Sequence, residues 1–596
     1  MIRYPKYKRK AHYRQVVDKF KGYNRNLRIG SGEFSEMENL TSDDYPVLSV
    51  RKKRGRYLYS MQDGGTATGM LFVPGTGLFI TVDHLDPQNQ DQPTVVGSLL
   101  LLGTDGEIGQ YCSGLLSGPK SLALMGKYLI IAPDMRWVHT DDLTDGEIHT
   151  SKELTEGAIK LDLYMADGTP LHKGYQGATP PEDPQSYSHW VDTSAGSAVV
   201  RRYSVPQQEW VEVSGTLVKL ESDDLAGNAF SVGDTVNITG LQDQVADFNG
   251  WHEIKERPSP EILVVNGIIP AGVIQSCQDH PVKLERSVPS LDFIVECGNR
   301  IWGCCSSTNE LFACKLGDFK NWNSYPGIST DSWFVTVGTP GPFTGAAVQN
   351  GYPIFYKEHC KHKVWPSATA AHQMTTVSCA GVEKGSEGSL AVCDGTVFYK
   401  STLGIFADDG GGPVEIGQAL GKGSYRNGIG AVHDRKYYLS LEDTAGKRAL
   451  FVFDISAGMW HRESSIPGSL CSAGESLFGA YGELWDLTGN TGTPEEEVSW
   501  MAVTGDLGLE NPEQKYISRL TLRLSLDPGA TLEIYAQYDR EQIWVKLGQV
   551  YGTDLRSFSL PIRPRRCDQL KLKLQGRGMC KVYSITKTLE KGSELP

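Results

Sequence analysis

Short apolar stretches separated by turn residues run along most of the chain. In the first part, apolar runs at residues 69–73, 77–82, 98–102 and 127–132 are bounded by Gly, Pro, Asp or Asn. Runs of this length with turn residues at their ends are typical of β-strands joined by tight turns. The pattern therefore predicts an all-β chain built from many short strands.

The rhythm changes twice between residues 170 and 290. Residues 170–200 lose the alternation of strands and turns, which indicates a linker or crossover. Residues 210–220 then alternate apolar and polar side chains with period two, and further strand-like runs follow at 230–239 and 261–265. Strict alternation is typical of half-buried strands, so this segment predicts a small antiparallel β-barrel or sandwich inserted into the surrounding fold.

The first pattern resumes near residue 292 and contains a loose repeat. An apolar strand leads into a polar turn and an aromatic residue at 311–322, at 450–460 and, more weakly, at 159–168. Propeller blades can end in this way, because the turn requires Gly, Asp or Asn while the aromatic residue packs between blades. We expect about six or seven blades on this basis, with one large β-sandwich as the alternative.

The last hundred residues form another alternating module. Residues 516–526 and 531–538 flank an Asp-Pro-Gly turn, and strand-like runs follow at 569–574 and 581–585. This module predicts a C-terminal β-sandwich of jelly-roll type.

The predicted fold is all-β, with a β-propeller-like body, an inserted small β-barrel or sandwich domain and a C-terminal β-sandwich. The expected domains are a basic N-terminal arm and lead-in strand over residues 1–54, the first part of the propeller over 55–200, the inserted domain over 201–290, the second part of the propeller over 291–495 and the C-terminal sandwich over 496–596.

Composition narrows the class of protein. The 596 residues carry a formal net charge of -13, which argues against a protein that holds nucleic acid over most of its surface, because such binding depends on Lys and Arg neutralising phosphates. The longest apolar runs, such as 95–102, are strand-sized rather than the ~20 residues of a membrane helix. The N-terminus has no secretory signal pattern, and the 12 cysteines are expected to be reduced, as in a cytoplasm.

Positive charge is concentrated at the start of the chain. Residues 1–28 hold ten Lys and Arg residues and a single acid, Asp18. Such a terminus is either a solvated arm or an arm that docks on an acidic neighbour or on nucleic acid. The candidate partner-docking residues are Lys6, Lys8, Arg9, Lys10 and Arg14.

Motifs for catalysis and cofactor binding are missing from the sequence. There is no phosphate-binding P-loop, no G-x-S-x-G elbow that leads into a helix and no H-E-x-x-H. The segment His359-Cys-Lys-His362 and the cysteines 304, 305 and 314 suggest a zinc site, but their spacing fits no paired-ligand pattern. We therefore expect no catalytic, cofactor-binding or metal-binding residues, and no enzyme activity.

Acidic pairs and tryptophans raise the question of glycoside chemistry. Two carboxylates about 5–9 Å apart perform glycoside hydrolysis, but adjacent acids in a strand point to opposite faces, and acids in turns mostly cap backbone N–H groups. Tryptophans at strand ends are expected in the core, although they could stack on sugars. The acidic pairs are Asp141-Asp142, Asp223-Asp224 and Asp408-Asp409, and the tryptophans are Trp137, Trp190, Trp302, Trp322, Trp460 and Trp485.

Three parts of the sequence resemble virion proteins of bacteriophage tails, of the tail-nozzle or tail-tubular-B type. The opening is similar at residues 20–24, 32–41 and 45–54; the central part at 351–357, 385–389, 394–399 and 404–407; and the ending at 561–568, 575–578, 583–585 and 590–593. The resemblance covers about half of the chain; the insert and the basic arm have no counterpart in it.

The resemblance implies a structural protein of the virion, assembled in the host cytoplasm. Its members are propeller-containing subunits of a ring, typically a hexamer, that lies below the adaptor or portal and continues the DNA ejection channel. The implied partners are copies of the same chain, the adaptor or portal-side protein, distal tail proteins and the passing genome, without specific DNA binding and without membrane insertion. The alternative is a β-propeller that binds or cleaves carbohydrate as a receptor-binding tail protein.

Overall fold

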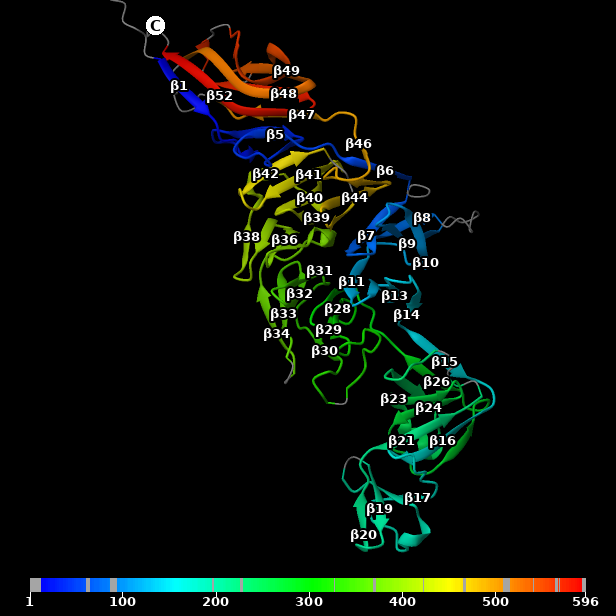
Figure 1. Ribbon diagram of the computed structural model, residues 1–596. Helices are drawn as coiled ribbons and strands as arrows, with labels where there is room; N and C mark the ends of the chain where they lie inside the picture. Colours follow the sequence, from blue (N-terminus) through cyan, green and yellow to red (C-terminus); the bar gives the residue numbers. More distant parts are fainter. Residues whose placement is uncertain are drawn as a thin grey trace, which may run out of the picture. The chain divides into compact units, whose positions relative to one another are not determined.

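Almost all regular structure in the protein is β-strand, as the computed structural model shows (Figure 1). The structure describes residues 12–60, 65–85, 94–195, 198–223, 225, 229–325, 327–367, 371–421, 423–464, 468–507, 515–539, 541–562, 566–567 and 569–591. Within these residues the helical elements are short 3-10 turns, and no helix is long and apolar enough to cross a membrane. The turns are η2 (Pro184–Ser186), η3 (Asp243–Phe248), η4 (Glu387–Ser389) and η5 (Gly417–Leu420).

The chain folds into two compact units. Unit 1 comprises residues 1–120, 343–363 and 375–596, and unit 2 comprises residues 121–342 and 364–374. In the described residues, six four-stranded sheets and one five-stranded sheet are built mainly from strands that neighbour each other in the sequence. Sheets of this kind, one after another along the chain, are the blades of a propeller-like body, so the predicted all-β, propeller-like class is confirmed.

The bounds of the blade strands follow in chain order. The first three sheets are β7 (Thr66–Val73), β8 (Gly77–Leu85), β9 (Val95–Gly103) and β10 (Ile108–Leu115); β11 (Ser121–Met125), β12 (Tyr128–Ala132), β13 (Arg136–His139) and β14 (Asp145–Glu147); and β27 (Phe293–Glu296), β28 (Ile301–Cys305), β29 (Glu310–Ala313) and β30 (Trp333–Thr336). The next three are β31 (Gly345–Gln349), β32 (Tyr352–Lys357), β33 (Cys360–Trp365) and β34 (Gln373–Ser378); β35 (Ala391–Cys393), β36 (Thr396–Ser401), β37 (Gly404–Asp408) and β38 (Pro413–Glu415); and β39 (Arg426–His433), β40 (Lys436–Glu442), β41 (Arg448–Asp454) and β42 (Met459–Glu463). The last is β43 (Ser469–Ala473), β44 (Ser476–Tyr481), β45 (Glu483–Asp486), β6 (Gly55–Ser60) and β46 (Thr493–Pro494).

The last blade combines strands from both ends of the propeller sequence. Strand β6 pairs with β45, where Tyr57 lies opposite Leu484. The first blade, β7 to β10, lies beside this last blade: Ser469 Oγ donates a hydrogen bond to the Ala67 carbonyl at 3.1 Å. Their shared apolar core includes Leu78, Leu100 and Leu484, all at most 3 % exposed. Burial on both faces explains why these strands are continuous apolar runs rather than alternating ones.

The inserted region of unit 2 is larger than the sequence predicts. An eight-stranded sheet has the order β15-β26-β22-β23-β24-β21-β16-β25, and a separate four-stranded sheet runs from β17 to β20. The eight strands are β15 (Thr150–Leu154), β16 (Ala158–Met165), β21 (Thr216–Glu221), β22 (Thr235–Thr239), β23 (Gly250–Ser259), β24 (Ile262–Asn266), β25 (Val273–Ser276) and β26 (Val282–Arg286). The four are β17 (Gly174–Gly177), β18 (His189–Asp192), β19 (Val199–Ser204) and β20 (Glu209–Glu212).

The insertion therefore begins at Thr150 rather than at residue 201, and strands occupy much of the span expected to be a linker. Strands β15 and β16 look like propeller strands in the sequence, but their partners are distant: Thr150 pairs with Arg286, and Lys160 pairs with Glu221. The sheet that a strand joins is decided by its partners, which the local pattern does not encode.

The C-terminal module of unit 1 is an eleven-stranded sheet with one long bent strand, β48 (Lys515–Tyr538). The first part of β48 pairs with β52 and its second part with β51, while β49 follows it along both parts. Its other C-terminal strands are β47 (Ser499–Thr504), β49 (Val545–Leu560), β50 (Arg566–Cys567), β51 (Leu570–Arg577) and β52 (Cys580–Lys591). Leu522, Ile534 and Leu574 are fully buried in the core that this folded sheet encloses. The module differs from the predicted jelly-roll sandwich, because its strands form one continuous sheet, and the name C-terminal sandwich denotes this folded sheet.

The N-terminal segment belongs to this sandwich, which corrects its expected description as an arm. The strands are β1 (His12–Val17), β2 (Gly22–Tyr23), β3 (Glu33–Glu38), β4 (Leu40–Thr41) and β5 (Leu48–Val50). Strands β1, β3 and β5 pair with C-terminal strands, as where Phe34 lies opposite Thr504, while β2 pairs with β3 and β4 with β5. Blue strands therefore stand among orange and red ones in Figure 1. Although this segment is rich in charged residues, it also contributes buried apolar side chains, among them Phe20, Phe34 and Met37, each at most 3 % exposed.

Candidate functional site

The outer edge of the C-terminal sandwich carries exposed apolar side chains on a long strand. Strand β49 pairs with β48 from Leu560 to Val545, and within the described residues it has no second partner strand. Tyr551 is 64 % exposed, Leu555 45 % and Val545 44 %. A long strand edge with unpaired backbone groups and apolar side chains is a template for pairing with another chain.

The opposite edge of the same sheet is formed by a different strand. Strand β1 pairs with β52, β52 with β48, and β48 with β49, so β1 and β49 flank two central strands. Arg14 lies on β1 opposite Thr588 and is exposed. The other predicted docking residues, Lys6, Lys8, Arg9 and Lys10, lie outside the described residues.

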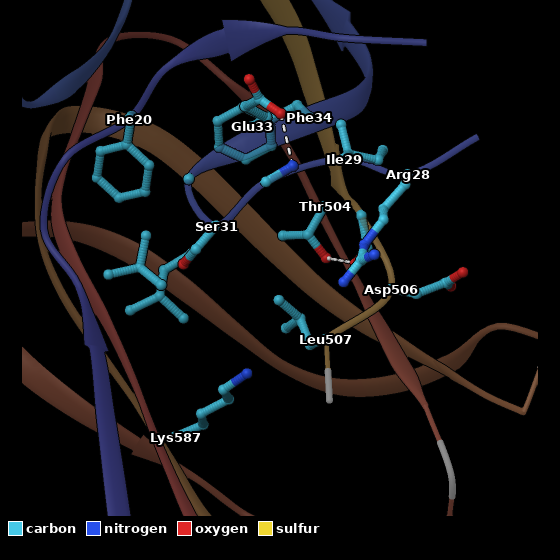
Figure 2. A pocket seen from close by; sticks show the side chains of 15 residues that line it. Phe20, Arg28, Ile29, Ser31, Glu33, Phe34, Thr504, Asp506, Leu507 and Lys587 are labelled. Atoms are coloured by element: carbon cyan, nitrogen blue, oxygen red, sulfur yellow. Dashed lines mark hydrogen bonds between the residues drawn. The ribbon is translucent and has the colours of Figure 1, made fainter. Parts of the chain in front are cut away.

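A small cavity adjoins the β1 edge (Figure 2). It has a volume of about 190 Å³ and lies between the N-terminal segment and the C-terminal strands. Phe20 and Phe34 contribute stacked rings with centroids 5.9 Å apart, while Lys587 and Asp506 contribute polar groups. The loop at its mouth is held by the Gly30 N–H, which donates to Glu33 Oε2 at 2.6 Å. The cavity can accept an apolar side chain or a ligand of a few atoms.

The acidic pairs are engaged locally. Asp142 accepts hydrogen bonds from the Thr144 N–H and hydroxyl at 3.0 and 2.8 Å, and these contacts lower its pKa. Asp408 is fully buried in an ion pair with Lys361, while Asp409 accepts from the Gly411 N–H at 2.9 Å. Asp223 is described but Asp224 is not. The described members of these pairs thus serve turns and ion pairs, as the sequence predicted for acids in turns.

Most of the tryptophans are structural. Trp302, Trp322, Trp460 and Trp190 are at most 6 % exposed, and Trp460 Nε1 donates to the Ile416 carbonyl at 2.8 Å. Trp137 and Trp485 are half-buried. Burial of the first four confirms that tryptophans at strand ends belong to the core, where they are unavailable for stacking on a sugar.

Two of the metal-ligand candidates, Cys360 and His362, lie on strand β33. Cys360 Sγ is 3.7 Å from His362 Nε2, and His362 Nδ1 is 2.9 Å from the Thr376 hydroxyl. Burial lowers the pKa of His362 to about 4, so this imidazole is neutral at pH 7. Among the described residues, no group of three or more His, Cys, Asp and Glu side chains is arranged to hold a metal ion.

One hollow of the propeller-like body does gather carboxylates. It has a volume of about 680 Å³ and is lined by Glu383, Glu415 and Tyr425. Glu383 Oε2 lies 3.1 Å from Lys400 Nζ, and the Lys400 side chain is 6 % exposed. Sequence reasoning missed this site, because Glu383 and Glu415 are isolated acids 32 residues apart in the sequence.

Sequence reasoning also missed the apolar edge. The local sequence pattern singles out neither Tyr551 nor Leu555. Only the strand order shows that β49 is an edge, and that these side chains face solvent.

Comparisons with known proteins yield a weak likeness to β-propeller proteins. No family model matches the chain, and no curated protein matches it. Among solved structures, phage phi92 endosialidase is 9 % identical over 83 % of this chain and 60 % of its own length, with a TM-score of 0.19. This chain therefore spans less than two thirds of that protein. An exo-β-1,3-galactanase from Phanerochaete chrysosporium is 8 % identical over 90 % of this chain and 100 % of its own, with a TM-score of 0.19. The six-bladed fungal lectin of Aleuria aurantia is 11 % identical over 70 % and 99 %, with a TM-score of 0.18. At these TM-scores the likeness carries no argument about function.

Proposed function

We propose that this chain is a structural subunit that assembles with copies of itself into a ring through its C-terminal sandwich. The observation that carries the proposal is the edge of β49, with Tyr551 and Leu555 exposed beside unpaired backbone groups. Soluble proteins usually protect such edges by charge, bulges or short length. Strand β49 has charged residues and register shifts in its pairing with β48, but it spans 16 residues and still exposes Tyr551 and Leu555. An edge of this kind is stabilised when a neighbouring chain covers it.

The difference between the two edges favours a ring over a dimer. A contact between two copies of the same edge is self-complementary and ends at a dimer, whereas a contact between β49 and the unlike β1 edge repeats around an axis. The cavity beside β1 supports this arrangement, because its phenylalanine-lined floor suits an apolar side chain of the neighbouring copy.

The resemblance to phage tail-nozzle proteins extends the proposal to a place in the virion. There the ring, a hexamer by analogy, would continue the DNA ejection channel and anchor the adaptor or portal-side protein and the distal tail proteins. The net charge of -13 supports a channel that releases DNA, because each additional Lys or Arg contact with phosphate would add adhesion.

The test is the assembly state of the purified full-length chain. Negative-stain imaging and mass photometry should show closed rings for the natural sequence and single chains for the double variant Tyr551→Lys/Leu555→Lys, since two lysines oppose pairing at the edge. The control is Leu403→Lys, which places one lysine at a residue 75 % exposed on a propeller strand turn and should leave the rings intact. Single chains from the natural sequence at micromolar concentration, or rings from the double variant, would refute the proposal.

A second candidate function is carbohydrate binding or cleavage by the propeller-like body. The observation that favours it is the 680 Å³ hollow with Glu383 and Glu415. A glycan array followed by a reducing-sugar assay tests this function. If the function is correct, the natural sequence should bind or cleave a carbohydrate, and Glu415→Gln should abolish that signal. A signal that survives the substitution would show that the carbohydrate does not bind in this hollow.

A further inference from the structure

A second hollow of unit 1 gathers positive charge on a chain that is acidic as a whole. Its volume is about 360 Å³, and it lies where the sandwich strands β2, β3 and β51 meet the propeller strands β41 and β42. Five cations and two carboxylates line it, although acids outnumber bases by 71 to 58 in the whole sequence. The cations are Arg25, Lys447, Arg448, Arg462 and Lys571, and the carboxylates are Glu36 and Asp443.

Carboxylates neutralise few of these cations, although Arg448 Nη2 lies 3.8 Å from Glu442 Oε2. Asp443 Oδ1 accepts from the N–H groups of Ala445 and Lys447, both at 2.9 Å, so it closes its own turn. Lys571 has its acid partner, Asp506, at 3.7 Å, near the limit of an ion pair. Within the part of the chain that the structure describes, Arg25, Lys447 and Arg462 make no ion pair, which leaves their charge available to a ligand.

Aromatic residues rather than acids position the central guanidinium group. Phe451 lies between two tyrosines, with ring centroids 6.0 Å from Tyr23 and 5.4 Å from Tyr425. Both tyrosine hydroxyls lie near Arg25 and raise the pKa of its guanidinium, the Tyr23 hydroxyl most strongly. Burial raises the pKa of Tyr23, so this hydroxyl stays protonated at neutral pH and can donate a hydrogen bond. Arg25 is therefore oriented without being neutralised.

We infer that this hollow binds the phosphate group of a sugar phosphate or polyol phosphate. Guanidinium groups match the oxygens of phosphate with parallel, charge-assisted hydrogen bonds, and three of them line the same hollow as two lysines. The neutral groups at the site, such as the Asn26 amide and the Tyr425 hydroxyl, suit the hydroxyls of an attached sugar or polyol. A concave site of this size accepts a small organic ligand rather than the outer surface of a DNA duplex.

The test uses the full-length chain and calorimetric titration at constant ionic strength, with glycerol 3-phosphate and inorganic phosphate as probes. Both should bind saturably, with glycerol 3-phosphate the tighter. Arg462→Gln should weaken both by about tenfold or more, because a hydrogen bond to a charged group contributes about 1.5–3 kcal/mol and each 1.4 kcal/mol is tenfold in affinity. Arg577→Gln is the matched control, since Arg577 is an exposed arginine of β51 that does not line this hollow, and it should leave both affinities unchanged.

Other outcomes would overturn the inference. Absence of saturable binding by the natural sequence, or equal binding by Arg462→Gln, would refute the site. Equal affinity for the two probes would refute the part of the inference that concerns the polyol. Tighter binding of duplex DNA or polyglutamate, lost in Arg462→Gln, would identify a nucleic-acid or protein contact instead. If Arg462→Gln fails to fold, Lys447→Gln at an exposed turn makes the same test. Ring assembly does not enter this experiment, so its outcome is independent of the proposed function.

Discussion

Replacing Glu463 by Gln should loosen the attachment of the N-terminal segment to the propeller strand β42. Glu463 Oε2 lies 2.7 Å from Arg54 Nη2 and 3.8 Å from Arg51 Nε, and the three side chains are 8 %, 3 % and 6 % exposed. A second acid, Glu495, contacts Arg51 from the linker to the sandwich. Breaking a buried ion pair by removing one partner costs about 3–5 kcal/mol, because the remaining charge is buried without compensation.

The expected effect is local, so the assay is hydrogen exchange measured by mass spectrometry. A loss of about 3–5 kcal/mol corresponds to exchange that is faster by about 160-fold to 5,000-fold, provided that residues 48–56 and β42 open together. The double variant Arg54→Met/Glu463→Leu should recover most of the protection, because apolar groups of similar volume can replace a buried pair without loss. Unchanged exchange in Glu463→Gln, or a double variant worse than the single one, would refute this account of the contact.

Two further predictions concern acid stability and the insertion. Burial lowers the pKa of His461 to about 4, below its ordinary value of 6.5, so between these pH values the unfolded chain binds a proton that the folded chain does not. The stability that the neutral His461 contributes is therefore fully present above pH 6.5 and falls with decreasing pH, by about 2 kcal/mol at pH 5. Urea unfolding at pH 7 and pH 5 should show a smaller loss of stability for His461→Gln than for the natural sequence. An equal loss of stability in the two proteins would contradict the assignment. Phe230→Ala removes a fully buried ring from the core of the inserted sheet and should lower the stability of that sheet by about 3–5 kcal/mol. Limited proteolysis should then cleave within residues 150–286 while β48 stays protected. An insertion that resists the protease would contradict the prediction.

The local pattern of apolar and polar residues was sufficient to predict a strand where that strand has one buried face. The alternation at residues 516–526, 531–538 and 569–574 predicts strands with alternate side chains inside, and Leu522, Ile534 and Leu574 are buried as this pattern requires. The apolar runs at 77–82 and 98–102 likewise become β8 and β9. The turn predicted at residues 527–529 is wrong, because β48 runs through it as one bent strand. Side-chain periodicity is a property of the strand itself, so it can be read before the partners are known.

The local pattern could not predict which strands pair with each other. Strands β1 to β5 come from a segment that looks like a basic arm, yet they complete a sheet whose other strands lie more than 400 residues later. The cation-lined hollow depends on the same assembly, because Arg25 and Arg462 lie 437 residues apart in the sequence. The sequence alone determines that this protein is all-β and acidic, because composition and side-chain periodicity are local. The tertiary structure alone decides which strands are edges and which charges meet, because hydrogen bonding between strands is insensitive to their distance along the chain.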